Sequence, residues 1–388
     1  MAVAKQRMIH ARQTAMSEDI ARRITRDLKT PELIEVLSSL PGSDLHSLLL
    51  AVLKRRVAGI DLTQIKRPNA ASQASDVDSR LLHEVERAAY SSAAQFAAIE
   101  LSPLEPLGAL HSLTGLDQAN AVSTIRAFEC TSDPTLGLAI ECARRRQSPA
   151  NRRRPTRLCA TQRVTRFPVP RKPGMTAHFK LFSLLSGARD EGSFSFEIQG
   201  LREHIGVYLS LLASLKTKGF GFENIIVEIS DTRAIAALCC RFRIDQEEIR
   251  RFVKARDPGS SDRLLARYSS LWPGRVARPS EDLAGFDLPR HVLLHLRAIE
   301  QDVCAKLAAE HETVRFRFNM HRLNGLAYYR GPCFQIAAHN SRGDSYSIAD
   351  GGFVDWTRRM LLDEKERLLT SAVGMELLCR LFMVPLNP

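Results

Sequence analysis

The chain has 388 residues, of which 44% are hydrophobic, so it is long enough for two domains or for one large domain with an extension. Its net charge of +12 favours an anionic partner, which is a nucleotide, a nucleic acid or an acidic protein. No stretch approaches the roughly 18 apolar residues of a membrane span, and the N-terminus lacks an apolar signal core. These features predict a cytoplasmic protein with no membrane partner.

Residues 1–68 are predicted to form a basic, helical extension. Good helix formers fill residues 17–29 and 31–40, and Pro41-Gly42 marks a break before a third helix at 45–57. Residues 69–76 are small and polar, which is typical of a linker. The domain boundary is therefore placed there, and the second domain spans residues 69–388.

In the second domain, predicted strands alternate with predicted helices. Apolar residues recur at helical spacing over 77–89, and a strand is expected to begin near Phe96. Residues 225–229 form a short apolar run, while residues 314–321 alternate strictly between apolar and polar. This pattern favours an α+β fold with a mostly antiparallel sheet flanked by helices over a doubly wound parallel sheet.

Residues 96–107, with the sequence FAAIELSPLEPL, resemble motif 1 of class II aminoacyl-tRNA synthetases. In that family, motif 1 is a helix-strand element with a proline that forms the dimer interface. The resemblance implies a homodimer through about residues 100–110, with four leucines as its apolar side chains: Leu101, Leu104, Leu107 and Leu110.

Two further segments resemble parts of the substrate site of histidyl-tRNA synthetase. CTSDPT at 130–135 is similar to a loop whose acidic residue and threonine hold the amino group, which implies this role for Asp133 and Thr135. A carboxylate suits an ammonium group because their hydrogen bond is charge-assisted. RVTRFPVP from residue 163, followed by FKLF, resembles motif 2, two antiparallel strands whose arginine contacts the ATP α-phosphate and the substrate carboxylate. Arg166 matches that arginine, and Lys180 is a second ATP-binding candidate.

The sequence RLNGLAYYRGPCF at 322–334 resembles the histidyl signature RGLDYYTGxxF, whose paired tyrosines line the amino-acid pocket. Asn324, Tyr328 and Tyr329 are therefore expected to bind the substrate. On a strand, the two tyrosines would point to opposite faces, and one would leave the pocket side.

The sequence DGGFVD at 350–355 resembles the glycine-rich GGRYD strand of the same family. The resemblance implies that Gly351 and Gly352 form the pocket floor. Strand glycines also mark bulges, which is the plainer interpretation.

The sequence AVGMEL at 372–377 resembles motif 3, which implies that Glu376 binds ATP and a bridging Mg²⁺. Three arginines of the family are replaced here, by Asn324, Phe353 and Leu377. Their loss matters because one such contact to a developing charge is commonly worth about 3 kcal/mol.

Two other arginines are expected to take over lost charges. Arg322 lies two residues before Asn324 on an expected strand and would face the same side. Arg380 lies about one helical turn after Leu377. Arg166, Arg322 and Arg380 are therefore the predicted catalytic residues.

The resemblance covers about residues 76–388, with a histidyl-type helical insert at about 215–312 and no anticodon-binding domain. It implies one of two functions. The first is ATP-dependent amino-acid activation with Mg²⁺, followed by transfer of the acyl-adenylate to a non-tRNA acceptor. The second is a non-catalytic amino-acid sensor similar to the regulatory subunit of ATP phosphoribosyltransferase. The amino acid is not identified, because residues 181–185 lack the glutamine and glutamate that bind imidazole in the histidyl enzyme.

A dense basic block precedes motif 2, from Arg144 to Arg157. A phosphate-rich partner could dock there, and a carrier protein, an amine or a tRNA-like acceptor is the partner that the activation function would require. A solvated loop is the plainer interpretation of the same charges.

Overall fold

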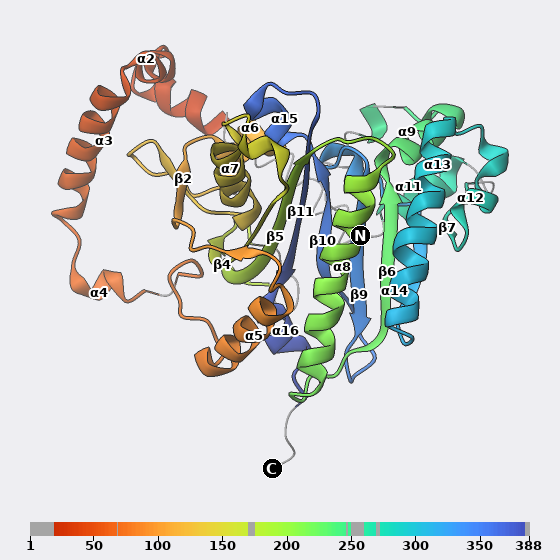
Figure 1. Ribbon diagram of the computed structural model, residues 1–388. Coiled ribbons are helices and arrows are strands. Elements are labelled where there is room, and N and C mark those ends of the chain that lie inside the picture. The colour runs from red at the N-terminus through yellow and green to blue at the C-terminus, as the bar shows by residue number, and fades with distance from the viewer. Residues whose placement is uncertain are drawn as a thin grey trace.

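The computed structural model describes residues 19–67, 69–169, 175–245, 247–249, 260–268 and 272–384. Within these residues, nine strands form one sheet at the centre of the molecule (Figure 1). Neighbouring strands are antiparallel except that β1 beside β4 and β6 beside β8 are parallel, which confirms the predicted α+β class. In sheet order, the strands are β1 (Ala97–Ala98), β4 (Thr156–Thr165), β5 (His178–Arg189), β11 (Glu366–Gly374), β10 (Ser345–Val354), β9 (Pro332–His339), β6 (Glu223–Asp231), β8 (Arg315–Asn319) and β7 (Arg275–Val276).

Helices cover both faces of the sheet, and side chains alternate between these faces along each strand. One layer packs on Phe182 and Leu184, on what we call the α8 face; it consists of α5 (Ser79–Ser92), α8 (Ser195–Lys216) and α16 (Met375–Phe382). The other layer packs on Leu185 and Leu368, on what we call the α7 face; it consists of α7 (Pro134–Arg146) and α15 (Trp356–Leu361). Each side chain on a strand of this sheet therefore lies on either the α8 face or the α7 face.

Most of the predicted insert lies between β6 and β8. It contains α9 (Thr232–Arg241), α11 (Ser260–Tyr268), α12 (Pro279–Asp282), a 3₁₀ turn (Ala284–Phe286), α13 (Arg290–Ile299), a π-helical turn (Glu300–Cys304) and α14 (Ala305–Glu310). Residues 215–312 also contain β6 and β7, so this region is not purely helical, and β6 lies between β9 and β8 in the main sheet.

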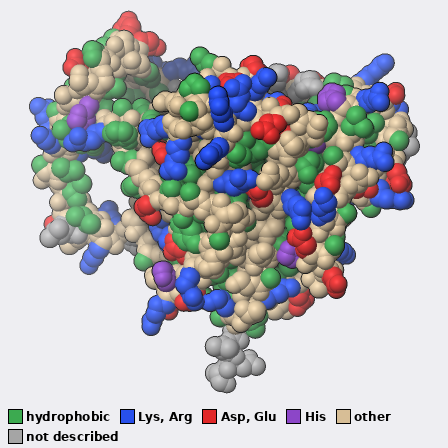
Figure 2. All heavy atoms as spheres, viewed as in Figure 1, with side chains coloured by type: hydrophobic (Ala, Val, Ile, Leu, Met, Phe, Trp, Pro, Cys, Tyr) green, Lys and Arg blue, Asp and Glu red, His purple; other side chains and the backbone are tan. Residues whose placement is uncertain are grey.

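The N-terminal residues form a helical arm beside the sheet domain. Residues 19–27 are helical, and α2 (Leu33–Ser39), α3 (Gly42–Val57) and α4 (Leu62–Ile65) follow, so the predicted break at Pro41 is confirmed. No residue of α2 or α3 is buried. Figure 2 shows hydrophobic and basic side chains mixed on this arm, with an opening between it and the rest of the molecule.

The segment after the arm lies against the sheet domain and is not a free linker. His178 Nε2 lies 2.6 Å from the carbonyl oxygen of Gln73, and Ser75 Oγ donates to Glu376 over 2.9 Å. Arg380 Nε donates to Asp76 over 2.7 Å. These three residues, Gln73, Ser75 and Asp76, therefore attach the predicted linker to β5 and α16.

The segment expected to form a dimer interface is a small, separate sheet. It pairs β2 (Leu104–Pro106) with β3 (Phe128–Cys130), and α6 (Ala109–Thr114) follows β2. The buried carboxylate of Glu129 accepts hydrogen bonds from the backbone N–H groups of Gly108 and Leu110, at 2.9 and 2.8 Å. Leu110 is buried in the chain's own core, so it is not part of an exposed interface as expected.

A fully buried ion pair fixes α7 on the sheet. Arg146, at the end of α7, donates through Nε and Nη2 to the two carboxylate oxygens of Glu366 over 2.7 and 2.9 Å. Both side chains have no exposed surface. Gly187 of β5 lies under this contact, since a Cβ there would come within 2.7 Å of the Cys142 sulfur.

We expect Arg146→Met to lower the free energy of unfolding by about 3–5 kcal/mol, because it leaves Glu366 buried without a partner. The double variant Arg146→Met/Glu366→Leu should cost less than the two single changes added together, since no charge is then buried. Urea unfolding of the four proteins measures this. Arg145→Met, on the exposed side of the same helix turn, is the control. Additive losses would show that the two charges do not depend on each other.

We also expect a homodimer that forms through the β2–β3 sheet, where Leu107 and Phe128 are 49% and 44% exposed. Light scattering should give the mass of two protomers. Leu107→Glu/Phe128→Glu should give one protomer, because each change places a charge in the contact. Leu294→Glu, at an exposed leucine of α13 at the other end of the molecule (Figure 1), should leave the dimer intact. A protomer mass for the unaltered protein at micromolar concentration would contradict this expectation.

Candidate functional site

The predicted amino-group ligands meet at the start of α7. Asp133 is the N-cap of this helix, and its Oδ1 accepts hydrogen bonds from the Thr135 backbone N–H over 3.0 Å and from the Thr135 hydroxyl over 2.8 Å. Its Oδ2 accepts from Arg166 Nη2 over 3.1 Å, and Arg166 Nε donates to the Ser132 carbonyl over 2.8 Å. Asp133, Thr135 and Arg166 therefore form one cluster.

This acid–base pair is open to solvent on one side, with 43% of the Arg166 side chain and 25% of the Asp133 side chain exposed. The guanidinium lies over the ring of Phe179, 5.2 Å from its centroid, on the same side of the β4–β5 hairpin. An α-amino acid carries one ammonium and one carboxylate group. Asp133 and Arg166 are complementary to these two groups, and in this structure they satisfy each other.

The paired tyrosines follow a 3₁₀ helix (Leu323–Ala327), so the expected strand at this position is wrong. Tyr328 is the C-cap of this helix, and the rings of Tyr328 and Tyr329 meet edge to face at 5.0 Å. Tyr328 also packs against Trp356 at 5.6 Å. The Tyr328 hydroxyl hydrogen bonds to the Thr135 side chain, and burial raises the pKa of this tyrosine well above its usual value. Tyr328 thereby joins the tyrosines to the Asp133 cluster.

Asp350 connects the rest of the signature to this cluster and was not among the predicted site residues. Its Oδ2 accepts from Arg322 Nη2 over 2.5 Å, and its Oδ1 accepts from the Tyr329 hydroxyl. The Arg322 guanidinium lies 5.4 Å from the centroid of the Tyr329 ring. Arg322 is held in a turn, not on a strand, and Asn324 points to the exposed side, so the two do not share a face as expected. The only sequence signal for Asp350 was its place two residues before Gly352.

Gly351 and Gly352 lie on β10 and face opposite sides of the sheet. A Cβ on Gly352 would come within 2.5 Å of the Tyr329 ring, so this glycine makes room for the tyrosine. A Cβ on Gly351 would come within 2.7 Å of Phe334 on the α8 face. Of these two glycines, only Gly352 borders a tyrosine of the pair. The bulge considered from the sequence lies elsewhere on β10, between Ser347 and Ala349.

Of the three residues expected to bind ATP, Lys180 and Glu376 lie on the α8 face of the sheet, away from Arg166. Lys180 pairs in register with Arg163, and its Nζ donates to both carboxylate oxygens of Glu86 on α5 over 2.9 Å. Alternation along β5 places its neighbours Phe179 and Leu181 on the opposite face from Lys180. Lys180 is therefore engaged by a carboxylate and separated by the sheet from Asp133.

Glu376 is buried between two guanidinium groups. Arg163 Nη2 lies 2.6 Å from one carboxylate oxygen and Arg380 Nη2 lies 2.8 Å from the other. Arg380 also donates to Asp76. Both carboxylate oxygens of Glu376 are therefore already paired with cations. Within the described ranges, no three His, Cys, Asp or Glu side chains gather into a group that could hold a metal ion. Lys180 and Glu376 would have to release these partners before they could bind ATP or Mg²⁺.

The sheet topology, the two helical layers and the order of these segments define the fold. The fold is that of the class II aminoacyl-tRNA synthetase core of the histidyl type. A scan of protein-family models and a search of curated protein sequences find no match to the chain. None of the described helices is long and apolar enough to cross a membrane.

Solved structures with this fold are similar over most of both chains. One is described as an ATP phosphoribosyltransferase regulatory subunit/histidyl-tRNA synthetase from Bacillus halodurans, with a TM-score of 0.60 and 15% identity over 81% of this chain and 83% of that one. A histidine–tRNA ligase subunit from Alicyclobacillus acidocaldarius has a TM-score of 0.58 and 16% identity, over 81% of this chain and 96% of that one. Histidyl-tRNA synthetase from Nostoc sp. PCC 7120 has a TM-score of 0.57 and 15% identity, over 82% of this chain and 74% of that one. At these identities, the likeness establishes the fold.

A buried carboxyl group lies beside the candidate site. Glu105, on β2, is 3% exposed, and neither of its oxygens has a hydrogen-bond partner of good geometry within the described residues. Burial, together with the nearby charges of Asp133 and Glu129, raises the pKa of Glu105 to about 8. Its ionisation is therefore coupled to the site.

We expect Glu105 to make stability depend on pH. In the unfolded chain this carboxyl titrates near pH 4.5, whereas the folded protein keeps its proton up to about pH 8. The folded state therefore binds more protons in this window, and stability falls as pH rises from about 4.5 to 8. Glu105→Gln should match the unaltered protein in melting temperature at pH 5 and exceed it at pH 8. Glu100→Gln, at an exposed position, is the control, and a difference that is constant from pH 5 to 9 would contradict this account.

Proposed function

We propose that the chain binds a free α-amino acid between Asp133 and Arg166 and acts as a non-catalytic amino-acid-sensing subunit. The observation that carries this proposal is the contrast between the two faces of the sheet. On the α7 face, an acid–base pair that matches an amino acid is assembled and partly exposed. On the α8 face, Lys180 is already paired with Glu86, and Glu376 is already paired with Arg163 and Arg380.

Binding would exchange one ion pair for two. The ligand's ammonium group replaces Arg166 at the Asp133 carboxylate and also reaches the Thr135 hydroxyl, while its carboxylate takes the released Arg166 guanidinium. The gain is modest for an exposed pair and larger when the ligand excludes water from these groups. The edge-to-face tyrosines and Trp356 supply a rigid wall next to this pair.

One unpaired donor supports a polar ligand. Nη1 of Arg322 is buried, and the described residues provide it with no acceptor. A buried charged donor without an acceptor destabilises the protein, so a water molecule or a polar atom of the ligand side chain is expected to accept a hydrogen bond from it. Arg322 lies against Tyr329, whose ring contacts Tyr328, and this supports a contact between the unpaired donor and the side chain of a bound amino acid.

A sensor needs a partner to which it responds. One of the proteins with this fold is described as an ATP phosphoribosyltransferase regulatory subunit/histidyl-tRNA synthetase, which supports a protein partner for this chain. The arm provides surface for such a contact, since α2 and α3 bury none of their residues and several of their apolar side chains are exposed, among them Leu48, Val52 and Val57.

A second candidate, ATP-dependent amino-acid activation, is favoured by Arg166 alone. It keeps the place of the motif 2 arginine at the end of the β4–β5 hairpin. In that reaction, the amino-acid carboxylate attacks the α-phosphorus of ATP and pyrophosphate leaves, which requires cations around the phosphates. Lys180 would first have to release Glu86. Arg380 would have to release both Glu376 and Asp76.

We expect one amino acid out of a panel of twenty to raise the melting temperature without ATP. Asp133→Asn should weaken its binding at least about tenfold, because a charge-assisted contact is lost while asparagine still caps the helix. Arg166→Met should do the same. Isothermal titration calorimetry on the full chain measures both effects.

The matched control is Lys180→Met, which removes a cation of the same hairpin on the other face and should leave amino-acid binding unchanged. A pyrophosphate-exchange assay with the same panel tests the second candidate. Exchange that depends on an amino acid and is lost in Arg166→Met would replace the sensor function with the ligase function. Absence of any amino-acid binding would refute both.

A further inference from the structure

The basic block forms a cavity of about 1120 Å³ at the end of α7 remote from Asp133. Six of its twelve lining residues are arginine and none is Asp or Glu; the arginines are Arg145, Arg152, Arg153, Arg154, Arg157 and Arg189. We propose that this cavity binds a ligand carrying two or more adjacent phosphate groups. The two ends of α7 are roughly 20 Å apart, so this site is separate from the proposed amino-acid site and does not depend on it.

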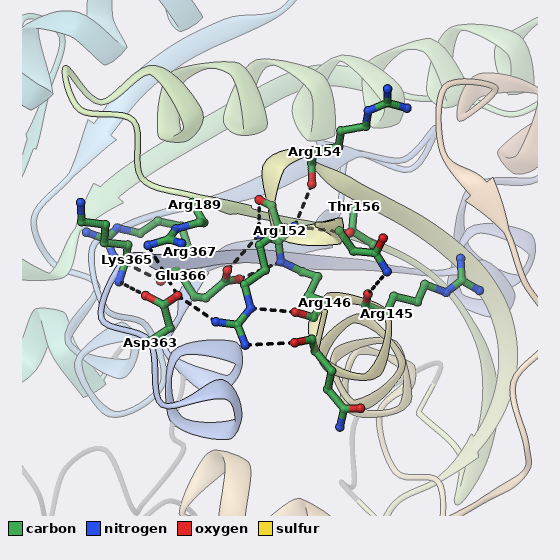
Figure 3. Close-up of polar contacts among 12 residues, drawn as sticks. Arg145, Arg146, Arg152, Arg154, Thr156, Arg189, Asp363, Lys365, Glu366 and Arg367 are labelled. Atoms are coloured by element: carbon green, nitrogen blue, oxygen red, sulfur yellow. Dashed lines mark hydrogen bonds and ion pairs between the residues drawn. The ribbon is translucent and has the colours of Figure 1, made fainter. Parts of the chain in front are cut away.

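The loop that carries the arginines is fixed by the buried ion pair (Figure 3). Arg146 Nη1 donates to the Arg154 carbonyl over 2.9 Å, so the guanidinium that binds Glu366 also holds the loop. Arg152 Nε donates back to the Arg146 carbonyl over 2.8 Å, and Asn151 Nδ2 donates to the Arg145 carbonyl over 2.9 Å. The cavity wall is therefore ordered in advance, which lowers the entropy lost on binding.

The C-terminal end of a helix carries a partial negative charge that normally repels anions, and here the positive charge of Arg152 offsets that charge. Its guanidinium contacts the last carbonyls of α7 and also Asp363 over 3.1 Å. Asp363 is shared with Arg189 at 3.7 Å, so one carboxylate serves two cations.

Of the other four cavity arginines, two have a carboxylate partner and two have none among the described residues. Arg145 pairs with Glu141 and Arg157 pairs with Glu203, each within 2.7 Å. Arg153 and Arg154 are exposed and form no ion pair with the described residues. Figure 3 shows the Arg154 side chain extending away from the Asp363 and Glu366 cluster. The cavity thus keeps an excess of positive charge on guanidinium groups, which bind phosphate oxygens in pairs.

The lining favours phosphates over bases. It contains no aromatic side chain on which a base could stack; its apolar members are Pro149, Ala150, Pro155 and Leu158. Six arginines lining one cavity suit a compact group with several charges better than a single phosphate. Inorganic polyphosphate and the phosphate tail of a nucleoside triphosphate share this chemistry.

Calorimetric titration of the full chain with inorganic triphosphate tests the site. Arg153→Glu/Arg154→Glu, at two exposed positions, should weaken binding at least about tenfold, because two charge-assisted contacts become repulsive. The matched control is Arg55→Glu/Arg56→Glu on the exposed α3 helix, which changes the net charge equally and should alter the dissociation constant less than about twofold. Binding should persist in Arg166→Met.

ATP and single-stranded polyuridylate complete the test. ATP that binds no tighter than triphosphate supports recognition of the phosphates alone, whereas binding ten times tighter would show that the base is recognised and would overturn the proposal. Equal losses in both double variants would mean that the whole molecule's charge, not this cavity, attracts the anion. Polyuridylate that binds and is not displaced by triphosphate would assign the surface to nucleic acid and overturn the proposal as well.

Discussion

The buried ion pair between Arg146 and Glu366 determines where α7 lies on the sheet, and both candidate sites depend on that position. Neither charge can leave its partner without a large loss of stability, since both side chains are fully buried. The C-terminal end of α7 is thereby fixed at the start of β11. The N-terminal end, 13 residues away along a rigid helix, brings Asp133 within reach of Arg166.

By fixing α7, this ion pair also positions the two groups of charged side chains at the ends of that helix. At one end of α7, an acid and a base satisfy each other while partly exposed, so a zwitterion can take their place at little cost in buried charge. At the other end, guanidinium groups outnumber carboxylates around an ordered loop, so an anion adds favourable contacts. The sheet separates a third group of charges, around Glu376 and Glu86, in which cations and carboxylates are already matched.

Features that depend on neighbouring residues could be predicted from the sequence. The helical spacing of 77–89, the break at Pro41 and the alternation along β8 each gave an element that the structure contains. Asp133 followed by proline is a typical helix start, and the structure has a helix from Pro134 with Asp133 as its cap. The meeting of Asp133, Thr135 and Arg166 followed from resemblance to a known motif order, since no local pattern connects residues 33 positions apart.

Only the tertiary structure decided which distant side chains share a face. Arg146 and Glu366 are 220 positions apart, and Asp350 contacts Arg322 across a turn that had been expected to be a strand. The contacts of Gln73, Ser75 and Asp76 depend on where β5 and α16 end. The sequence by itself determined local backbone preferences and the types of charge at each position. The pairing of those charges was set by strand order and register, because these bring together segments that carry no signal of each other in the chain.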